Sequence, residues 1–404
     1  MVNVAILGFG TVGSGVAEVL TTNSDLIGRR VDELVNLKYI LDVRDFPGSP
    51  YEHCFVKDFS VIEQDPEVDV VVETIGGATI ALEFTTRALK AGKSVVSSNK
   101  ELVATHGYEL LQLAREHGVS YLFEASVGGG IPILRPLTAC LAANEFDQIT
   151  GILNGTTNYI LTRMIRAGLT FEQALKEAQD NGYAEKDPTA DVDGHDACRK
   201  ICILAALSFG EHVYPNQVPT EGIRNVTLAD VAYADSCGYK IKLLGRAIRQ
   251  EGGKVCAFVA PHLVPCENPL AGVEDVFNAV SVTGNAVGDV MFYGRGAGKL
   301  PTASAVVADV IDIAKDKKRD HHNQWGPGRE DLVVSPDILT SRWYIHTTAS
   351  VEQLRSACGE VQPLARSGAP AGETACLTPP MTEPELKERL SHIELLSKLR
   401  VLSE

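Results

Sequence analysis

The sequence predicts an α/β fold: a Rossmann-type doubly wound parallel sheet, an α+β substrate and dimerisation domain, and a small βαβ-type C-terminal module. Two observations predict the first domain. Residues 2–7 form an almost wholly apolar run, as expected of a strand that is covered on both faces. Strand-like runs then alternate with helical stretches as far as residue 126. This alternation is typical of a parallel sheet with helices on both faces.

The segment GFGTVG follows the first strand directly and opens a helix. Glycines at these spacings let the backbone approach a pyrophosphate, and free N–H groups at a helix N-terminus bind its negative charge. The position between a buried strand and a helix favours a dinucleotide site over an ordinary tight turn. The candidate cofactor-binding residues in this segment are Gly8, Phe9, Gly10, Thr11, Val12 and Gly13.

The pattern continues along the first third of the chain. We expect strands at residues 38–43, 68–76, 94–98 and 121–126, and helices at 79–92 and 101–117. The ligand crevice of a doubly wound sheet lies beyond the carboxyl ends of its strands. Because residues 74–77 and 97–100 fall at that edge, the further candidates for cofactor contact are Thr74, Ser98 and Lys100.

Two residues after the second strand bear on the choice of cofactor. Asp42 is a suitable acceptor for the ribose 2′-hydroxyl of NAD, whereas Arg44 is a suitable partner for the 2′-phosphate of NADP. Both cofactors therefore stay open, and the arginine at the tip of the strand favours NADP.

Composition excludes several classes of partner. The 404 residues include 37 basic and 52 acidic side chains, and the resulting formal charge of -15 repels nucleic acid and anionic membranes. No apolar run reaches the roughly 18 residues of a membrane-spanning helix, and the N-terminus has no basic leader. The nine cysteines contain no C-x-x-C pair. We expect a cytoplasmic protein with reduced thiols and a small-molecule substrate.

The middle of the chain carries an unusual acidic stretch, NGYAEKDPTADVDGHDACRK, at residues 181–200. Helices are predicted at 156–168 and 170–182, with Gly182 as the residue that follows the second helix. Pro188 interrupts any helix, and Asp191 is predicted to cap the next one. That helix is predicted from residue 197 to residue 210.

Asp196 and Lys200 are four residues apart on this helix and therefore share one face. A solvated pair of this kind stabilises a helix only slightly. Here, however, residues 201–207 are apolar all round, which predicts burial and places Lys200 at the border of a core. Burial lowers the pKa of a lysine while neighbouring carboxylates raise it, and this balance suits a group that transfers protons. The other carboxylates can bind a cationic amino group.

The same stretch, from Ala178 to Lys200, resembles the signature of homoserine dehydrogenases: an alanine, a glycine with an aromatic residue, Asp-Pro, three further fixed positions and the lysine. The segments that support the resemblance are GFGTVG, VVETIGG (71–77), AGKSVVSSNKEL (91–102), EASVGGGIP (124–132), GILNGTTNYIL (151–161) and GRGAGKLPTASAVVAD (294–309). Together they cover most of residues 1 to 315.

The resemblance implies the reversible NAD(P)H-dependent reduction of L-aspartate 4-semialdehyde to L-homoserine, in threonine and methionine biosynthesis. It implies that Lys200 gives a proton to the carbonyl oxygen and that Lys100 stabilises the developing alkoxide. It further implies that Glu185 binds the substrate ammonium and that Asp196 orients substrate and lysine. Asp191 would support this network, and Gly182 belongs to the same substrate-binding segment.

The resemblance also implies a monovalent cation such as sodium, with a structural role, and a close approach of Gly298 to the cofactor. The positions that match the cation site are Glu124, Val127, Gly129 and Ile131. Oxygen ligands of this kind suit a hard cation. A homodimer or homotetramer is expected.

The sequence predicts four parts. A dinucleotide-binding domain spans 1–135 with a return segment at about 294–315, and a substrate and dimerisation domain spans 136–293. A hydrophilic linker spans 316–338. Residues 339–404 resemble an ACT module, with strands and helices in alternation, but the segment TTASVEQL lacks the acidic turn and glycine that usually follow the first strand. Threonine inhibition and a purely dimerising role both stay open.

Three other hypotheses compete with this function. Aspartate-semialdehyde dehydrogenase chemistry needs a cysteine nucleophile beside a histidine, and no cysteine here stands in a recognisable motif of that kind. Another NAD(P)-dependent amino-acid dehydrogenase would share the cofactor domain. A dinucleotide-sensing regulator would bind the cofactor without turnover, so a homoserine-dependent change in cofactor absorbance separates it from an enzyme.

Overall fold

The computed structural model describes residues 1–316 and 325–403. The first domain is built on a parallel six-stranded sheet in the order β3-β2-β1-β4-β5-β6. Its strands are β1 (Val2–Leu7), β2 (Val35–Leu41), β3 (Phe55–Val56), β4 (Val68–Glu73), β5 (Ser94–Ser97) and β6 (Tyr121–Leu122). This is the Rossmann strand order, so the predicted fold class is confirmed.

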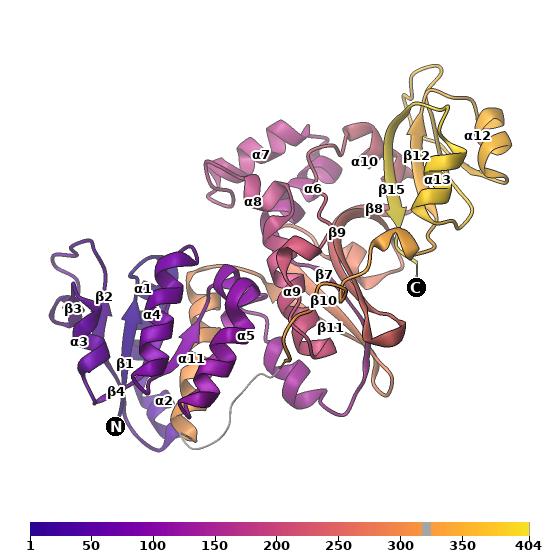
Figure 1. The fold of residues 1–404 in the computed structure, drawn as a ribbon. Helices are drawn as coiled ribbons and strands as arrows, with labels where there is room; N and C mark the ends of the chain where they lie inside the picture. Colours follow the sequence, from indigo (N-terminus) through magenta and orange to yellow (C-terminus); the bar gives the residue numbers. More distant parts are fainter. Residues whose placement is uncertain (317–324, 404) are drawn as a thin grey trace.

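Helices cover both faces of this sheet (Figure 1). They are α1 (Thr11–Thr22), α2 (Ser24–Val31), α3 (Phe59–Gln64), α4 (Thr79–Lys90), α5 (Lys100–Glu116) and α11 (Lys299–Lys315). Although α11 is remote in sequence, its buried Ala303 and Val306 share one core with Val16 and Ala17 of α1. A Cβ on Gly15 would lie 2.7 Å from the Lys299 carbonyl oxygen, so this close crossing requires a glycine.

The remaining strands form one mixed nine-stranded sheet in the order β11-β10-β7-β8-β9-β15-β12-β14-β13. The middle strands are β7 (Phe146–Ile152), β8 (Tyr239–Arg249), β9 (Val255–Pro265), β10 (Phe277–Gly284) and β11 (Gly288–Arg295). The C-terminal strands are β12 (Trp343–Thr347), β13 (Gln362–Leu364), β14 (Thr374–Leu377) and β15 (Leu395–Val401). Since β15 pairs with β9 through Arg400 and Val401, the C-terminal segment extends the middle sheet.

Helices of the second half lie around this sheet and near its C-terminal end (Figure 1). They are α6 (Gly155–Ala167), α7 (Phe171–Asp180), α8 (Thr189–Val192), α9 (His195–Phe209), α10 (Leu228–Ser236), α12 (Val351–Cys358) and α13 (Glu383–Arg389). In the C-terminal segment the expected order of strand, helix, strand, helix and strand is found, and β13 is an additional short strand.

Several predicted boundaries were wrong. The second strand runs from Val35 to Leu41, because Val35 already pairs with Val2. The strand expected over 68–76 ends at Glu73, and the one expected over 121–126 ends at Leu122. A 3₁₀ turn at Glu124–Ser126 replaces its last part. The apolar residues of that part are buried, but they turn away from the ladder.

The segment expected as a linker lies partly outside the described residues, which exclude 317–324. From Trp325 onward the chain packs closely: Trp325 is buried against Phe123, and its indole Nε1 donates to Nδ1 of His212 at 3.0 Å. No helix in residues 1–316 or 325–403 is both long and apolar enough to cross a membrane.

Candidate active site

The glycine turn between β1 and α1 has the shape that a dinucleotide requires. Gly8 has φ +89°, and a Cβ on Gly13 would lie 1.9 Å from the Gly8 carbonyl oxygen, so both positions exclude other residues. A Cβ on Gly10 would meet nothing within 4 Å, and Gly10 caps α1 without a side-chain acceptor. The first N–H groups of α1 therefore have no side-chain acceptor at the N-cap, and such N–H groups suit a pyrophosphate.

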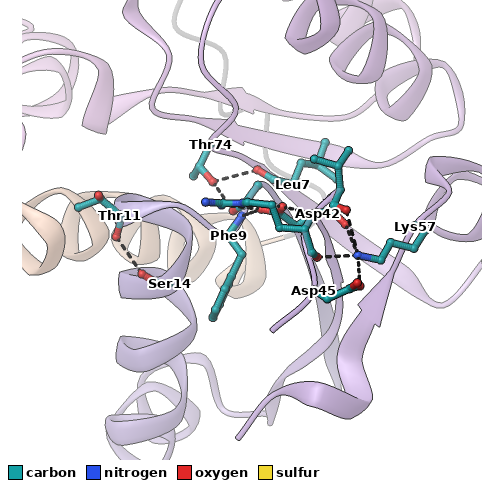
Figure 2. Close-up of polar contacts among 11 residues, drawn as sticks. Leu7, Phe9, Thr11, Ser14, Asp42, Asp45, Lys57 and Thr74 are labelled. Atoms are coloured by element: carbon teal, nitrogen blue, oxygen red, sulfur yellow. Dashed lines mark hydrogen bonds and ion pairs between the residues drawn. The ribbon is translucent and has the colours of Figure 1, made fainter. Parts of the chain in front are cut away.

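Asp42 fixes this turn to the end of β2 (Figure 2). Its carboxylate accepts from the backbone N–H of Phe9 at 2.7 Å and from that of Arg44 at 2.9 Å. The guanidinium of Arg44 donates to both carboxylate oxygens, at 3.1 and 3.0 Å, and it lowers the pKa of Asp42 to about 2. Lys57 holds the same loop by donating to the carbonyl oxygens of Asp42 and Val43. Arg44 itself is exposed.

Side-chain hydrogen bonds connect the carboxyl ends of β1, β4 and β5. The Thr74 hydroxyl donates to the carbonyl oxygens of Leu7 and Gly8, both at 2.9 Å (Figure 2). The buried carboxylate of Glu73 accepts from the Ser97 hydroxyl at 2.6 Å, and burial raises its pKa to about 7. Asn99 caps α5, which Lys100 begins. These contacts fix the strand ends that carry Thr74, Ser98 and Lys100.

A cavity of about 210 Å³ lies between the glycine turn, the start of α5 and the start of α11. Its lining residues are Thr11, Val12, Ser98, Lys100, Ala125, Ser126, Gly129, Lys200, Gly296, Ala297, Gly298 and Thr302. Gly298 precedes α11 with φ +132°. The cavity thus brings predicted cofactor-binding residues of the first domain together with Lys200 of α9.

Lys200 is nearly buried, with 8% of its surface exposed. Its ammonium donates to the Leu153 carbonyl oxygen and to Oδ2 of Asp196, both at 2.7 Å. Burial lowers the pKa of Lys200, and Asp196 opposes that effect. An ammonium has three N–H donors, so one remains for a ligand oxygen in the cavity that Lys200 lines. The sequence prediction of a lysine at the border of a core agrees with this position.

Asp196 stands between the two lysines. Its Oδ1 lies 2.7 Å from the Lys100 ammonium, and its Oδ2 lies 2.7 Å from that of Lys200. Burial alone would raise the pKa of Asp196, but the two positive charges outweigh burial and hold the pKa below its ordinary value. The charge of Asp196 in turn raises the pKa of Lys100. One buried carboxylate therefore keeps two ammonium groups next to each other at the cavity.

Asp191 belongs to the same cluster. It does not cap α9, although the sequence predicts that it does. It lies in the short helix α8, and Gly194 is the N-cap residue of α9. The prediction was wrong because Gly194, with φ +85°, makes a separate turn between the two helices. Burial and the neighbouring Asp196 raise the pKa of Asp191.

Glu124 lies near this cavity, at the start of the 3₁₀ turn. Its Oε1 accepts from the N–H groups of Ile133 and Leu134 at 2.6 and 2.9 Å, and its Oε2 accepts from that of Arg135 at 2.7 Å. Burial raises its pKa. Asp309 of α11 accepts from the Glu124 N–H at 2.9 Å.

The predicted cation ligands form an oxygen-rich loop. Across residues 1–316 and 325–403, no hydrogen bond ends on the carbonyl oxygens of Val127, Gly129 or Ile131. The described residues contain no cluster of three or more His, Cys, Asp or Glu side chains suited to a metal ion. One carboxylate and three carbonyl oxygens, the ligand set predicted from the sequence, would suit a hard monovalent cation rather than a transition metal.

None of the four predicted substrate-binding residues, Gly182, Glu185, Asp191 and Asp196, lines the cavity itself, although Asp196 holds the two lysines that do. Glu185 and Gly182 are exposed, in the loop between α7 and α8. This loop is tied to the start of α6, because the Thr156 hydroxyl donates to the Tyr183 carbonyl oxygen at 2.6 Å. Gly182 has φ +74° and follows the end of α7, as predicted.

Sequence reasoning missed Asn154 as a site residue. Its Nδ2 donates to Oδ1 of Asp191 at 2.7 Å and to Oδ2 of Asp196 at 2.8 Å. Its segment, GILNGTTNYIL, places an asparagine between a strand and a helix, which is the signal of an N-cap. No sequence pattern indicates, however, to which carboxylates the NH₂ group of Asn154 donates.

The fold and the site define an NAD(P)-dependent oxidoreductase: a Rossmann sheet holds a glycine turn against a buried lysine and carboxylate. Comparisons with known proteins agree. Residues 8–124 match the family model described as homoserine dehydrogenase, NAD binding domain, and residues 132–311 match that of homoserine dehydrogenase. The chain belongs to the homoserine dehydrogenase family, and it acts on a CH–OH group with NAD(P).

Individual relatives support the assignment. The chain is 44% identical over 351 residues to the homoserine dehydrogenase of Bacillus subtilis strain 168, which covers 85% of this chain and 80% of that protein. The crystal structure of the enzyme from Thiobacillus denitrificans superposes with a TM-score of 0.90 at 34% identity, covering 100% and 98% of the two chains. A hyperthermophilic archaeal homoserine dehydrogenase in complex with NADPH has a TM-score of 0.65 at 30% identity, covering 78% and 98%.

Proposed function

We propose that Lys200 is the proton donor in the reduction of L-aspartate 4-semialdehyde to L-homoserine, and the acceptor in the reverse reaction. A bound nicotinamide supplies or accepts the hydride. The observation that carries the proposal is the ammonium of Lys200, which lines the same cavity as Thr11, Val12 and Gly298 and is held by Asp196. Its lowered pKa favours proton release as negative charge develops on the substrate oxygen.

Lys100 has a complementary role in this proposal. Its pKa is raised by Asp196, so it stays charged and stabilises the developing alkoxide without giving up its proton. Asp196 orients both lysines, and Asp191 supports it. Glu185 would complete the site by binding the substrate ammonium, and Gly182 belongs to the same substrate-binding segment, the loop that follows α7.

We propose that the cofactor-binding residues are those of the glycine turn, Gly8 to Gly13, with Arg44, Thr74, Ser98, Lys100 and Gly298. NADP is the preferred form, with NAD as the other. The support is the charge at the tip of β2: Arg44 neutralises Asp42 and remains exposed, so a 2′-phosphate meets a cation rather than an anion.

The substitution Arg44→Ala tests this preference. It removes the cation that neutralises the carboxylate of Asp42 and leaves that carboxylate only its two backbone donors, so NADP should bind roughly 10- to 100-fold more weakly while NAD changes little. Dissociation constants of both nucleotides, measured by cofactor fluorescence, give the result. Equal losses for the two nucleotides would mean that Arg44 does not contact the phosphate.

We propose that Glu124, Val127, Gly129 and Ile131 bind a monovalent cation such as sodium, with a structural role. The support is the set of carbonyl oxygens without hydrogen bonds beside a buried carboxylate. Replacing sodium by tetramethylammonium should lower the melting temperature, and Glu124→Gln should abolish the difference. The same melting temperature in both salts would contradict the site.

The proposed domain boundaries are 1–135 with a return at 294–315, 136–293, a linker at 316–338, and an ACT-like module at 339–404. The order of strands and helices in the last segment supports the module. Assembly as a homodimer or homotetramer is supported by β11, an edge strand that exposes Met291 and Tyr293 to 40% and 54%. Light scattering and a threonine titration of the activity test the assembly and the module.

We also propose a cytoplasmic location. All nine cysteines are free thiols in the structure, and six of them are buried. Free thiols suit a reducing compartment. Fractionation of cells that express the protein is the direct measurement.

A further inference from the structure

The turn between β7 and α6 contacts Asp191, Asp196 and Lys200, yet its own residues carry no charge. Asn154 is buried and is the N-cap residue of α6. Its Oδ1 accepts from the Thr157 N–H at 2.8 Å and from the Thr157 hydroxyl at 3.0 Å. Because the oxygen is committed to the helix, the NH₂ group must point the other way.

That NH₂ group meets two carboxylates. One N–H donates to Oδ1 of Asp191 at 2.7 Å, and the other donates to Oδ2 of Asp196 at 2.8 Å. The half-buried carboxylate of Asp191 and the buried one of Asp196 repel each other, and this repulsion adds to the effect of burial in raising the pKa of Asp191. A donor shared between them offsets part of this repulsion and holds their oxygens in place.

The residue before Asn154 completes the arrangement. The carbonyl oxygen of Leu153 accepts from the Lys200 ammonium, which also donates to the carboxylate oxygen that Asn154 contacts. One peptide segment therefore fixes the lysine through its backbone and the carboxylates through its side chain. Leu153 and Asn154 directly precede the first turn of α6, and this helix is buried over most of its length. The helix therefore holds both contacts in place.

We propose that Asn154 is a positioning residue of the active site: it orients Asp191 and Asp196 so that Asp196 can hold Lys100 and Lys200 at the cavity. The proposal deepens the roles given above and rests on them. The charged groups that face Asn154 are Asp191 of α8, Asp196 and Lys200 of α9 and, through Asp196, Lys100 of α5.

Two substitutions at this position test the proposal. Asn154→Asp keeps the helix cap but replaces the donor by a third carboxylate. Asn154→Ser also keeps a capping oxygen but no longer reaches Asp191 or Asp196. The matched controls are Asn268→Asp and Asn268→Ser, because Asn268 caps another turn in the second half of the chain through the Leu270 N–H.

We expect both Asn154 variants to lose kcat/KM for homoserine by about 10- to 100-fold per folded molecule, with folding measured by circular dichroism. In Asn154→Asp, the extra negative charge should also raise the pKa values of the cluster, so the low-pH limb of homoserine oxidation moves to higher pH. Asn154→Ser should lack that shift. Both Asn268 controls should keep the wild-type kcat/KM and pH profile.

Asn154 variants that stay within twofold of wild type, or that lose activity only in proportion to their unfolded fraction, would overturn the positioning role. An unshifted pH profile in Asn154→Asp would do the same. The roles on which it rests fail separately: if Lys200→Ala kept its turnover, the proposed proton donor would be wrong, whatever the Asn154 variants do.

Discussion

Two buried lysines in the middle of the chain, Lys200 and Lys242, make an instructive comparison. Lys200 is 8% exposed and Lys242 of β8 is 1% exposed. Each donates to a backbone carbonyl oxygen, and burial lowers the pKa of each. Lys200 has a carboxylate partner and faces a cavity, whereas Lys242 contacts the neutral amide oxygen of Asn158 at 3.1 Å and the Val273 carbonyl oxygen.

The difference shows what distinguishes a catalytic lysine from a structural one. Burial and a lowered pKa are common to both, so neither property identifies a proton donor. The distinguishing features are the anion, which keeps the charged form available, and the open space, which admits a substrate. Lys242 ties β8 to the segment around Val273; it has no carboxylate as a hydrogen-bond partner among the described residues, and it does not line the cavity.

Of the substitutions that test this difference, we expect Lys200→Ala to have the largest effect. Lys200→Ala should lower kcat by a factor of roughly 10²–10⁴, because general acid and base catalysis contributes about that much. The affinity for NADPH should stay nearly unchanged, since the lysine acts on substrate rather than on cofactor. Turnover is followed by the absorbance of the reduced nicotinamide.

The control for this variant is Lys242→Met, which removes another buried ammonium, one that does not line the cavity. It should keep kcat within a fewfold of wild type per folded molecule. A loss of turnover in Lys242→Met as large as in Lys200→Ala would mean that burial of a charge, rather than its place at the cavity, accounts for the effect.

A second effect concerns Asp196, the carboxylate partner of Lys200. Asp196 raises the pKa of Lys200, and burial lowers it. In Asp196→Asn the opposing charge is gone, so the pKa of Lys200 should fall further. The ammonium form is the one that donates, so activity in the reducing direction should decline at a lower pH than in wild type. A pH profile of kcat for aspartate semialdehyde reduction measures the shift.

An unchanged high-pH limb in Asp196→Asn would contradict the assignment of that limb to Lys200. Glu383→Gln is a suitable comparison, because Glu383 is also paired with a lysine, Lys398, in the C-terminal segment. That exchange should leave the pH profile as it is.

The same comparison explains how much the sequence could predict. The spacing of Asp196 and Lys200 and the apolar run after them predicted a lysine at a core border, and the GFGTVG segment predicted the cofactor turn. Lys242 has no such pattern: it lies in the strand YKIKLLGRAIR, where the alternation would place a lysine in solvent. It is buried because α6, through Asn158, and the loop around Val273 lie against that face.

Asn154 and the cavity were beyond sequence reasoning for a related reason. The contacts that matter join Asn154 to Asp191 and Asp196 across 37 and 42 residues, and Lys100 to Asp196 across two domains. Periodicity predicts local elements, but such contacts depend on how separate elements pack. The boundary errors have the same origin: the ends of β2, β4 and β6 are set by pairing with neighbours.

The smallest expected effect is on the pH dependence of stability, and it depends on Lys242 alone. Burial lowers the pKa of Lys242 from the ordinary 10.5 to about 8. Between these two values the unfolded chain binds a proton that the folded protein does not, so the free energy of unfolding rises with pH across this window. The full gap corresponds to about 3 kcal/mol.

Lys242→Met should remove this rise and leave the two proteins closest in stability at high pH, where the lysine of the folded wild type is neutral. Urea unfolding of both proteins at several pH values from about 8 to 10.5 gives the difference, and taking the difference cancels the tyrosines and other lysines that they share. Parallel stability curves would mean that Lys242 keeps its charge in the folded protein. Its two hydrogen bonds would then suffice to hold a buried cation without a carboxylate, and the anion beside Lys200 would no longer mark the difference between the two sites.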